Sequence, residues 1–226
     1  MTRKVFLFEI LLIAAALAAT AILYPHLPAM VPIHWNARVQ PDLFGSKRVL
    51  YLFGPGFMAA VMLLTWLFPW LSPKRFEIDS FWRTYHLVMV LLFGMMAYIY
   101  AAMLWADCGR SLNIVRAILC GVCLFIALFG NVMGKLRRNF YLGVRTPWTL
   151  ASERVWNRTH RFAAKIWVGA GLLGLALSMG GLYLWAVLPL LVGALTPMVY
   201  SLVIYKQLER RGELGDGLAH EQTGQG

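Results

Sequence analysis

Cysteines are the residues of this sequence with the clearest potential for redox chemistry. Cys120 and Cys123 have the C-x-x-C spacing of dithiol oxidoreductases, and helical spacing places both sulfurs on one face. A membrane thiol oxidant also needs a second cysteine pair to relay electrons, and Cys108 is the one cysteine that remains. The apolar sequence around the pair predicts a buried position in which thiols are inert. We therefore expect structural cysteines, with a thiol-disulfide oxidoreductase as a minor alternative.

Histidines, which are common metal ligands, are dispersed along the chain at His26, His34, His86, His160 and His220. The topology derived below places the first two outside the cell and His86 and His160 near the inner face, so no single metal site gathers them. The sequence contains no H-E-x-x-H zinc motif, no Walker loop and no G-x-S-x-G nucleophile elbow. We expect no catalytic residue, no metal and no cofactor, and therefore a protein that is not an enzyme.

One segment with many polar and aromatic side chains is the predicted outer loop, residues 25–49. Its four prolines prevent a continuous helix. Two interpretations stay open: a lid packed on the helix ends, with Trp35 as its plug, or a loop that recognises a ligand, because Trp is a favoured contact residue at interfaces. The candidate recognition residues are His34, Trp35, Asn36, Asp42 and Lys47.

A second long loop, residues 134–161, is basic and contains two tryptophans. Thr149 is a plausible helix N-cap, and Glu153 would lie in the first turn, at the positive end of the helix dipole. The helix that follows is expected to lie along the membrane before the fifth span begins. Arg145 and Trp148, beside a proline, are predicted to be buried in a structured turn. Setting the topology is sufficient explanation for the basic residues Lys135, Arg137 and Arg138.

The elements that must position these loops are transmembrane helices. Of the 226 residues, 60% are apolar and 14% charged, and the mean hydropathy is +0.64, which excludes an ordinary soluble enzyme and a disordered chain. A span needs about 20 apolar residues. Six segments qualify, at residues 5–24, 50–71, 85–105, 112–133, 162–178 and 183–205. The predicted fold is all-α: a polytopic bundle of about six transmembrane helices.

Orientation follows from the distribution of Lys and Arg, because cytoplasmic loops are enriched in both. With six spans, 16 of the 21 Lys and Arg residues lie on the side of the termini and five lie on the other side. We therefore expect both termini in the cytoplasm and the 25–49 loop outside. The formal net charge of +11 is then mostly a determinant of orientation.

Within the spans, polar residues are few. Glu9 is expected either to pair with Lys4 or another basic residue, or to lie at the inner interface. Because no chain of charged residues crosses the bilayer, a proton-coupled transporter is disfavoured. The glycines at 130, 134, 169, 171 and 174 predict close helix packing, in which Asn131 could hydrogen-bond to a neighbouring helix.

Two sets of motifs resemble the SdpI family of bacterial membrane proteins. The first comprises residues 31–36 (VPIHWN), 40–42 (QPD) and 45–47 (GSK); the second comprises 130–135 (GNVMGK), Asn139, 143–150 (GVRTPWTL), 153–156 (ERVW) and 159–161 (THR). Departures are Val39, where such proteins often have Gly, and Arg138, where Pro commonly precedes the Asn. The first departure could alter the outer turn and the choice of ligand.

The resemblance implies three regions: an N-terminal module at 1–71 with two spans and the outer loop, an SdpI-like four-helix region at 72–211, and a flexible tail at 212–226. It implies a multi-pass plasma-membrane protein that gives immunity to a secreted peptide toxin and that could signal by holding a small cytoplasmic repressor at the membrane. The implied partners are the lipid bilayer, the toxin and the repressor, with no direct contact to nucleic acid.

The resemblance also implies where the toxin and the signal act. We expect the toxin to contact the outer loop and to change the cytoplasmic exposure of the second motif. The cytoplasmic signature residues are Asn131, Arg145, Thr146, Trp148, Glu153, Trp156 and His160. The alternatives are a small-solute transporter or channel and, less favoured, the oxidoreductase.

Overall fold

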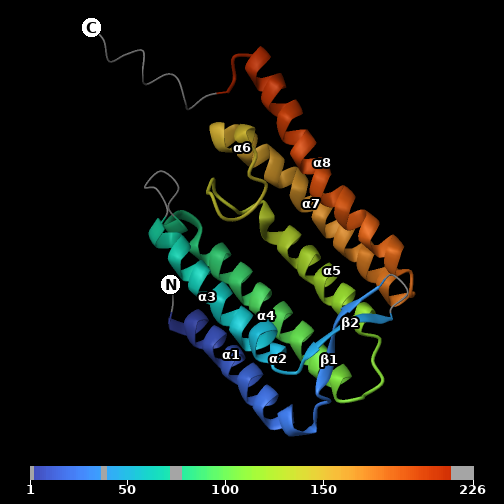
Figure 1. Ribbon diagram of the computed structural model, residues 1–226. Helices are drawn as coiled ribbons and strands as arrows, with labels where there is room; N and C mark the ends of the chain where they lie inside the picture. Colours follow the sequence, from blue (N-terminus) through green and yellow to red (C-terminus); the bar gives the residue numbers. More distant parts are fainter. Residues whose placement is uncertain (1–2, 37–39, 72–77, 215–226) are drawn as a thin grey trace.

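Six segments of the computed structural model are long and apolar enough to cross a membrane, which confirms the predicted all-α, polytopic fold (Figure 1). The structure describes residues 3–36, 40–71 and 78–214. The uninterrupted spans are α1 (Arg3–Leu23), α4 (Trp82–Asp107), α5 (Ile114–Met133), α7 (Glu153–Met179) and α8 (Tyr183–Arg210). Four of the six predicted segments agree with α1, α4, α5 and α8 to within five residues at each end, and the predicted 50–71 segment agrees with the second span, Val49–Leu71. Helix α7 begins nine residues earlier than the predicted fifth span.

The second span is not one regular helix but three consecutive pieces: α2 (Val49–Tyr51), a π-helical turn η2 (Leu52–Gly56) and α3 (Phe57–Leu71). Pro55 lies inside η2, where its missing N–H interrupts the regular hydrogen-bond ladder. Gly54 allows the aromatic ring of Tyr100 on α4 to approach so closely that a Cβ there would overlap it. The Tyr100 hydroxyl donates to the Leu50 carbonyl at 3.1 Å and lies 2.5 Å from Thr20 Oγ1, which joins α1, α2 and α4.

The outer loop forms a β-hairpin, which the sequence did not predict. Strands β1 (Met30–Trp35) and β2 (Pro41–Ser46) pair antiparallel, with Met30 opposite Ser46 and Trp35 opposite Pro41. Proline is tolerated at the first residue of a strand, which is where Pro41 lies. Four prolines thus exclude a helix without excluding a short, irregular sheet.

The helices pack in two groups. In Figure 1, α1, α3 and α4 lie together, with α2, and α5, α7 and α8 lie together as the second group. The contact between α4 and α5 joins the groups and is called the seam below. The buried cluster of the first group includes Ala16, Leu27, Val31, Leu50, Met58, Phe93, Tyr100 and Leu104. A second cluster crosses the seam and includes Tyr85, Met89, Phe129, Met133, Leu136 and Trp156.

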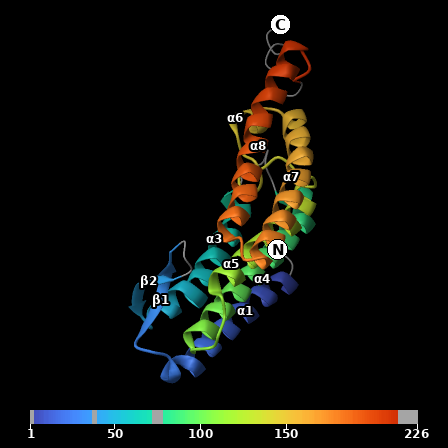
Figure 2. The same ribbon diagram turned by 90° about the vertical axis from the view of Figure 1, so that its right-hand side faces the viewer.

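The start of α1 and the end of α8 lie at the same end of the bundle, as an even number of spans requires. We call this end the basic end, because the basic residues from Lys135 to Arg161 also lie there, and the opposite end the hairpin end, because β1 and β2 lie there (Figures 1 and 2). Lys74, Arg75 and Val39, and most of the predicted 212–226 tail, lie outside the described residues.

Close helix packing at the predicted glycines is confirmed in the second group. A Cβ on Gly130 would lie 2.8 Å from the backbone nitrogen of Val168, and one on Gly171 would lie 2.5 Å from that of Ala127. Gly169, by contrast, faces open space. The expected interhelical bond of Asn131 is absent from the part of the chain that the structure describes, because Asn131 is exposed on α5.

Glu9 on α1 is fully buried, forms no ion pair among residues 3–36, 40–71 and 78–214, and has the Trp66 side chain as a neighbouring hydrogen-bonding group. The expected pair with Lys4 or with a basic loop residue is therefore not formed by the described residues.

Candidate functional site

A groove of about 440 Å³ lies between the hairpin and the helices at the hairpin end. Strand β1 supplies one wall, and α4, α5 and α8 supply the others. The lining residues are mostly apolar: Ile33, His34, Trp35, Asn36, Met103, Val115, Ile118, Leu119, Tyr183, Leu184 and Val187. We call this the hairpin groove. It brings together side chains of both helix groups, because α4 belongs to the first group and α5 and α8 belong to the second.

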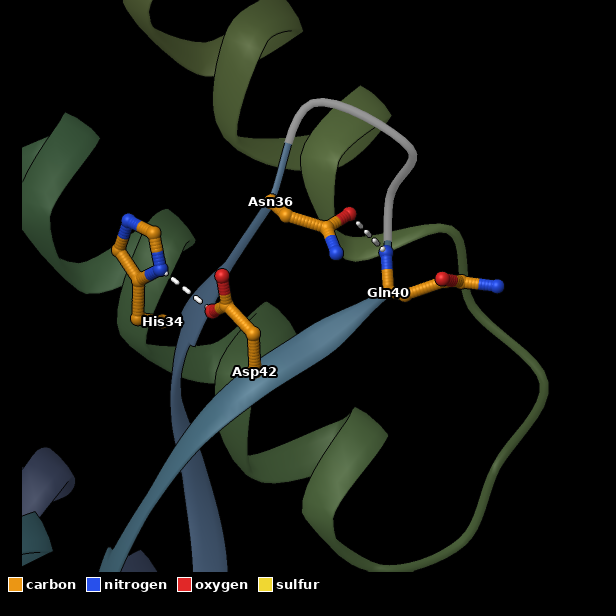
Figure 3. A network of polar contacts seen from close by, with 4 residues as sticks. All are labelled: His34, Asn36, Gln40 and Asp42. Atoms are coloured by element: carbon orange, nitrogen blue, oxygen red, sulfur yellow. Dashed lines mark hydrogen bonds and ion pairs between the residues drawn. The ribbon is translucent and has the colours of Figure 1, made fainter.

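Three of the five predicted recognition residues line this groove: His34, Trp35 and Asn36. Asp42 lies on the neighbouring strand, with its Oδ1 2.5 Å from Nδ1 of His34 (Figure 3). Both side chains are accessible, with 63% of His34 and 41% of Asp42 exposed. Trp35 is half-buried and faces the helix ends across the groove, so both interpretations of the outer loop, a lid and a ligand-recognition loop, stay predictions.

The other contacts of the predicted set fold the hairpin. Asn36 closes the turn: its N–H donates to the Gln40 carbonyl at 2.9 Å, and its Oδ1 accepts from the Gln40 N–H at 3.1 Å (Figure 3). Lys47 holds the base of the hairpin against the end of α1, because its Nζ donates to the carbonyls of Tyr24 and Leu27 at 2.8 and 3.2 Å. Lys47 is thus a positioning residue, and it does not line the groove.

At the basic end, the chain between α5 and α7 is folded as a cap, here defined as residues 134–152. Asn139 is fully buried and uses every polar atom of its side chain. Its Nδ2 donates to the carbonyls of Arg137 and Leu142, and its Oδ1 accepts from the N–H groups of Tyr141 and Leu142 at 2.8 and 2.7 Å. A buried amide with four backbone bonds fixes the path of the loop.

The side chains of Trp156 and His160 on α7 form hydrogen bonds to the backbone of the cap. The indole N–H of Trp156 donates to the Leu136 carbonyl at 2.7 Å. Nε2 of His160 accepts from the Val144 N–H at 3.1 Å, and its Nδ1 lies 2.9 Å from the Trp156 carbonyl. These two partners require a neutral imidazole with the proton on Nδ1. Gly143, at φ +98°, lies against His160 where a side chain would overlap the ring.

The helix starts in this region differ from the prediction. Thr146, not Thr149, is the N-cap, and it begins a short helix α6 (Pro147–Ala151). Thr149 is instead the third residue of a capping box: its Oγ1 accepts from the Thr146 N–H, and Thr146 Oγ1 accepts from the Thr149 N–H. Thr146 also reaches Ser201 on α8 at 2.9 Å. Ser201 lies outside both motifs, and no sequence pattern predicts this contact between residues 55 positions apart.

Ser152 ends α6 and caps α7, whose first turn contains Glu153 as predicted. From Glu153 to Met179 the helix is continuous. The expectation of a separate helix along the membrane before the fifth span is therefore wrong, because nothing interrupts the hydrogen-bond ladder between residues 153 and 162.

The predicted signature residues divide by exposure. Thr146 in the cap and Trp156 and His160 on α7 are buried, and their hydrogen bonds hold the cap in place. Arg145, predicted to be buried, is exposed, and its Nη1 donates to the Phe140 carbonyl at 2.6 Å. The other three are at least partly accessible: Asn131 is exposed, and Trp148 and Glu153 are half-buried. Glu153 lies 3.7 Å from Arg137.

Cys108, Cys120 and Cys123 are all free thiols. Cys123 is fully buried, and its sulfur lies where a Cβ on Gly174 would meet it at 2.8 Å, so it packs toward α7. Cys120 is half-buried and lines a groove on α4 and α5.

The comparisons with known proteins match both motif regions. Residues 135–205 match the model of the SdpI/YfhL protein family, and residues 11–59 match a domain of unknown function (DUF1648). The chain is 27% identical over 172 residues to immunity protein SdpI of Bacillus subtilis (strain 168), which covers 76% of this chain and 80% of that protein. No solved structure matches the chain. The resemblance that the motifs indicated is therefore confirmed: this multi-pass membrane protein is similar to the SdpI/YfhL family over residues 135–205 and to an SdpI immunity protein over most of its length.

Proposed function

We propose that this protein is a membrane immunity protein that binds a secreted peptide toxin in the hairpin groove. The similarity to an immunity protein over most of the chain supports the class of function and favours a role other than catalysis. We choose this site because the hairpin groove combines apolar side chains of α4, α5 and α8 with the polar residues His34 and Asn36 of the hairpin.

The chemistry of the groove suits an amphipathic peptide. Apolar side chains of α4, α5 and α8 offer burial, and each fully buried aliphatic side chain of a ligand would contribute about 1.5–3 kcal/mol. His34 and Asp42 present an exposed pair for polar or charged groups. Trp35, half-buried beside them, supplies the rigid aromatic contact that is common in recognition sites.

This proposal depends on the orientation of the protein in the membrane, which is predicted from the distribution of Lys and Arg: both termini in the cytoplasm and the hairpin outside. In that orientation a secreted peptide reaches the hairpin groove directly. Binding changes the protein only if the peptide prefers one arrangement of the helices. The groove contacts both helix groups, so a bound peptide would favour one placement of the groups relative to each other.

The test is protection of a toxin-sensitive bacterium that produces the protein. Trp35→Ala should abolish protection from the cognate peptide at unchanged membrane abundance. Trp185→Ala is the matched control, because Trp185 is an exposed tryptophan at the same end, next in sequence to Leu184, and does not line the groove. Full protection by Trp35→Ala would contradict the assignment of this groove. Uptake of a small solute by vesicles containing the protein, without any protection, would support the transporter alternative.

Signalling through a small cytoplasmic repressor is the second part of the proposal. The cap offers an exposed surface on which Arg145 and Phe140 lie together, joined by the bond from the Arg145 guanidinium to the Phe140 carbonyl. Arg145→Gln should reduce recruitment of the repressor to membranes while toxin protection persists. Arg158→Gln, an exposed change of equal charge on α7, should leave recruitment intact. Loss of protection in Arg145→Gln would contradict this separation of roles.

A further inference from the structure

A cavity of about 480 Å³ at the basic end is lined mainly by cationic and polar side chains, whereas the hairpin groove is lined mainly by apolar ones. It lies between the start of α4, the end of α5 and the first turns of α7, and we call it the basic cavity. Four cations line it, together with polar side chains and the first residues of α4: Ser80, Phe81, Trp82, Arg83, Thr84, Gly134, Lys135, Leu136, Arg137, Asn157 and Arg161. No carboxylate is among these lining residues.

Among the described residues, most of this positive charge has no carboxylate partner. Arg83, Lys135 and Arg161 form no ion pair within the described part of the chain, and Arg137 is 3.7 Å from Glu153, outside the cavity lining. Like charges gathered in a hollow raise the local potential and attract an anion. Ser80 and Thr84, on either side of the start of α4, add hydroxyl groups to the lining that can donate hydrogen bonds to an anion.

An apolar groove of about 460 Å³ lies along the same two helices. We call it the seam groove; α4 and α5 supply most of its lining, with Phe8 of α1 and Leu175 of α7 at its sides: Val90, Leu91, Gly94, Met95, Tyr98, Cys120, Gly121, Leu124, Phe125 and Leu128. On α4, positions 84, 91, 94 and 98 share one face, and on α5 positions 121 and 128 do. Thr84, which lines the basic cavity, is therefore in register with the seam groove, and Lys135 follows in the turn directly after α5 ends at Met133.

The spacing between the two sites fits one molecule. From Thr84 to Leu91 helix α4 advances seven residues, or about 10 Å, and from Leu128 to its end at Met133 helix α5 advances five residues, or about 7.5 Å, with Lys135 in the turn that follows. Asn131, exposed on α5, lies between them. We propose that the basic cavity and the seam groove together bind one anionic phospholipid, with its phosphate among the four cations and its acyl chains along the seam. Arg suits this ligand because its guanidinium donates two parallel bonds to phosphate oxygens.

The test is lipid binding by the purified full-length protein in detergent, followed by native mass spectrometry. Dioleoyl phosphatidylglycerol is the probe, dioleoyl phosphatidylcholine is the zwitterionic comparison, and inorganic phosphate tests for a soluble anion. We expect one tightly bound phosphatidylglycerol per chain, retained at phosphatidylcholine concentrations that displace the remaining lipid. Millimolar inorganic phosphate should compete only weakly, because it cannot occupy the seam groove.

Two variants separate the headgroup site from the chain site. The triple variant Arg83→Gln, Lys135→Gln and Arg161→Gln should weaken phosphatidylglycerol binding by about tenfold or more, because each removed cation loses its attraction to the phosphate. The matched control Arg158→Gln, Arg210→Gln and Arg211→Gln removes the same charge at the same end but leaves the cavity intact. Gly94→Leu should weaken lipid binding by filling the seam groove, without strain, because a Cβ at Gly94 meets no atom within 4 Å.

Each contrary outcome overturns the proposal. Equal losses in the triple variant and its control would mean diffuse attraction to the basic end. Complete displacement by inorganic phosphate, with no effect of Gly94→Leu, would mean a soluble phosphate compound as the ligand. Equal affinity for phosphatidylcholine would mean that the cations do not select the headgroup.

Discussion

Substituting alanine at Gly171 tests how closely α7 packs against the middle of α5. An added Cβ would lie 2.5 Å from the backbone nitrogen of Ala127 and 2.6 Å from the carbonyl oxygen of Cys123. Both atoms are backbone of α5, so no side-chain rotation relieves the overlap and the helices must separate. Overpacking of this kind costs about 1–3 kcal/mol, which offsets or exceeds the gain of about 1 kcal/mol from replacing a helical glycine by alanine.

Gly169→Ala is the control, two residues earlier in the same helix, because a Cβ there meets nothing within 4 Å. It gains the same helix propensity without the overlap. Gly171→Ala should therefore be less stable than Gly169→Ala by about 1–3 kcal/mol, or about 2–12 °C in Tm for a chain of this size. Thermal unfolding in detergent, followed by tryptophan fluorescence, measures the difference. Equal Tm values for the two variants would refute the close approach of α5 and α7.

Three further predictions concern the cap, the hairpin and the orientation. Trp156→Phe should lower the stability by about 1–3 kcal/mol, because it leaves the buried Leu136 carbonyl without its donor; an unchanged denaturation midpoint would contradict this role. Lys47→Met should speed proteolysis within the hairpin, since the bonds that hold its base to the end of α1 are lost, and unchanged cleavage rates would show that packing alone holds it. In intact cells, an impermeant maleimide should label Ser46→Cys and spare Arg211→Cys in a background without native cysteines; the reverse pattern would invert the topology.

The spans could be predicted because the physics that selects them is simple. Within a bilayer the backbone has no partner other than itself, so about 20 consecutive apolar residues are almost always a helix. Glycines at 130, 171 and 174 were predictable as close contacts for a related reason, since small residues are what permits helices to approach in lipid. The division into regions 1–71 and 72–211 stays a prediction; α4 packs against both α1 and α5.

The hairpin and the cap could not be predicted in detail, because the conformation of each depends on contacts between residues that are distant in the sequence. His34 and Asp42 are eight positions apart, and their pairing depends on a strand register that the prolines disturb. Thr149 looked like an N-cap because the cap preference of threonine is local. Thr146 took that place through its bonds to Thr149 and to Ser201, 55 positions away. Arg145 was predicted to be buried because it stands with Trp148 beside a proline turn, but its charged side chain is exposed at the surface.

The seam between the helix groups has a consequence for how events at the two ends relate. The shared buried cluster joins the groups near the basic end, where Tyr85 and Met89 meet Phe129 and Trp156. Toward the hairpin end no single cluster of the described residues crosses the seam in this way, and the hairpin groove lies there instead. The two helix groups thus share a buried core at the end that carries the cap, whereas toward the hairpin end α4 and α5 meet at the close approach of Gly121 to Tyr98. We expect a molecule bound in the hairpin groove to influence the two groups at the end where they share no buried cluster among the described residues.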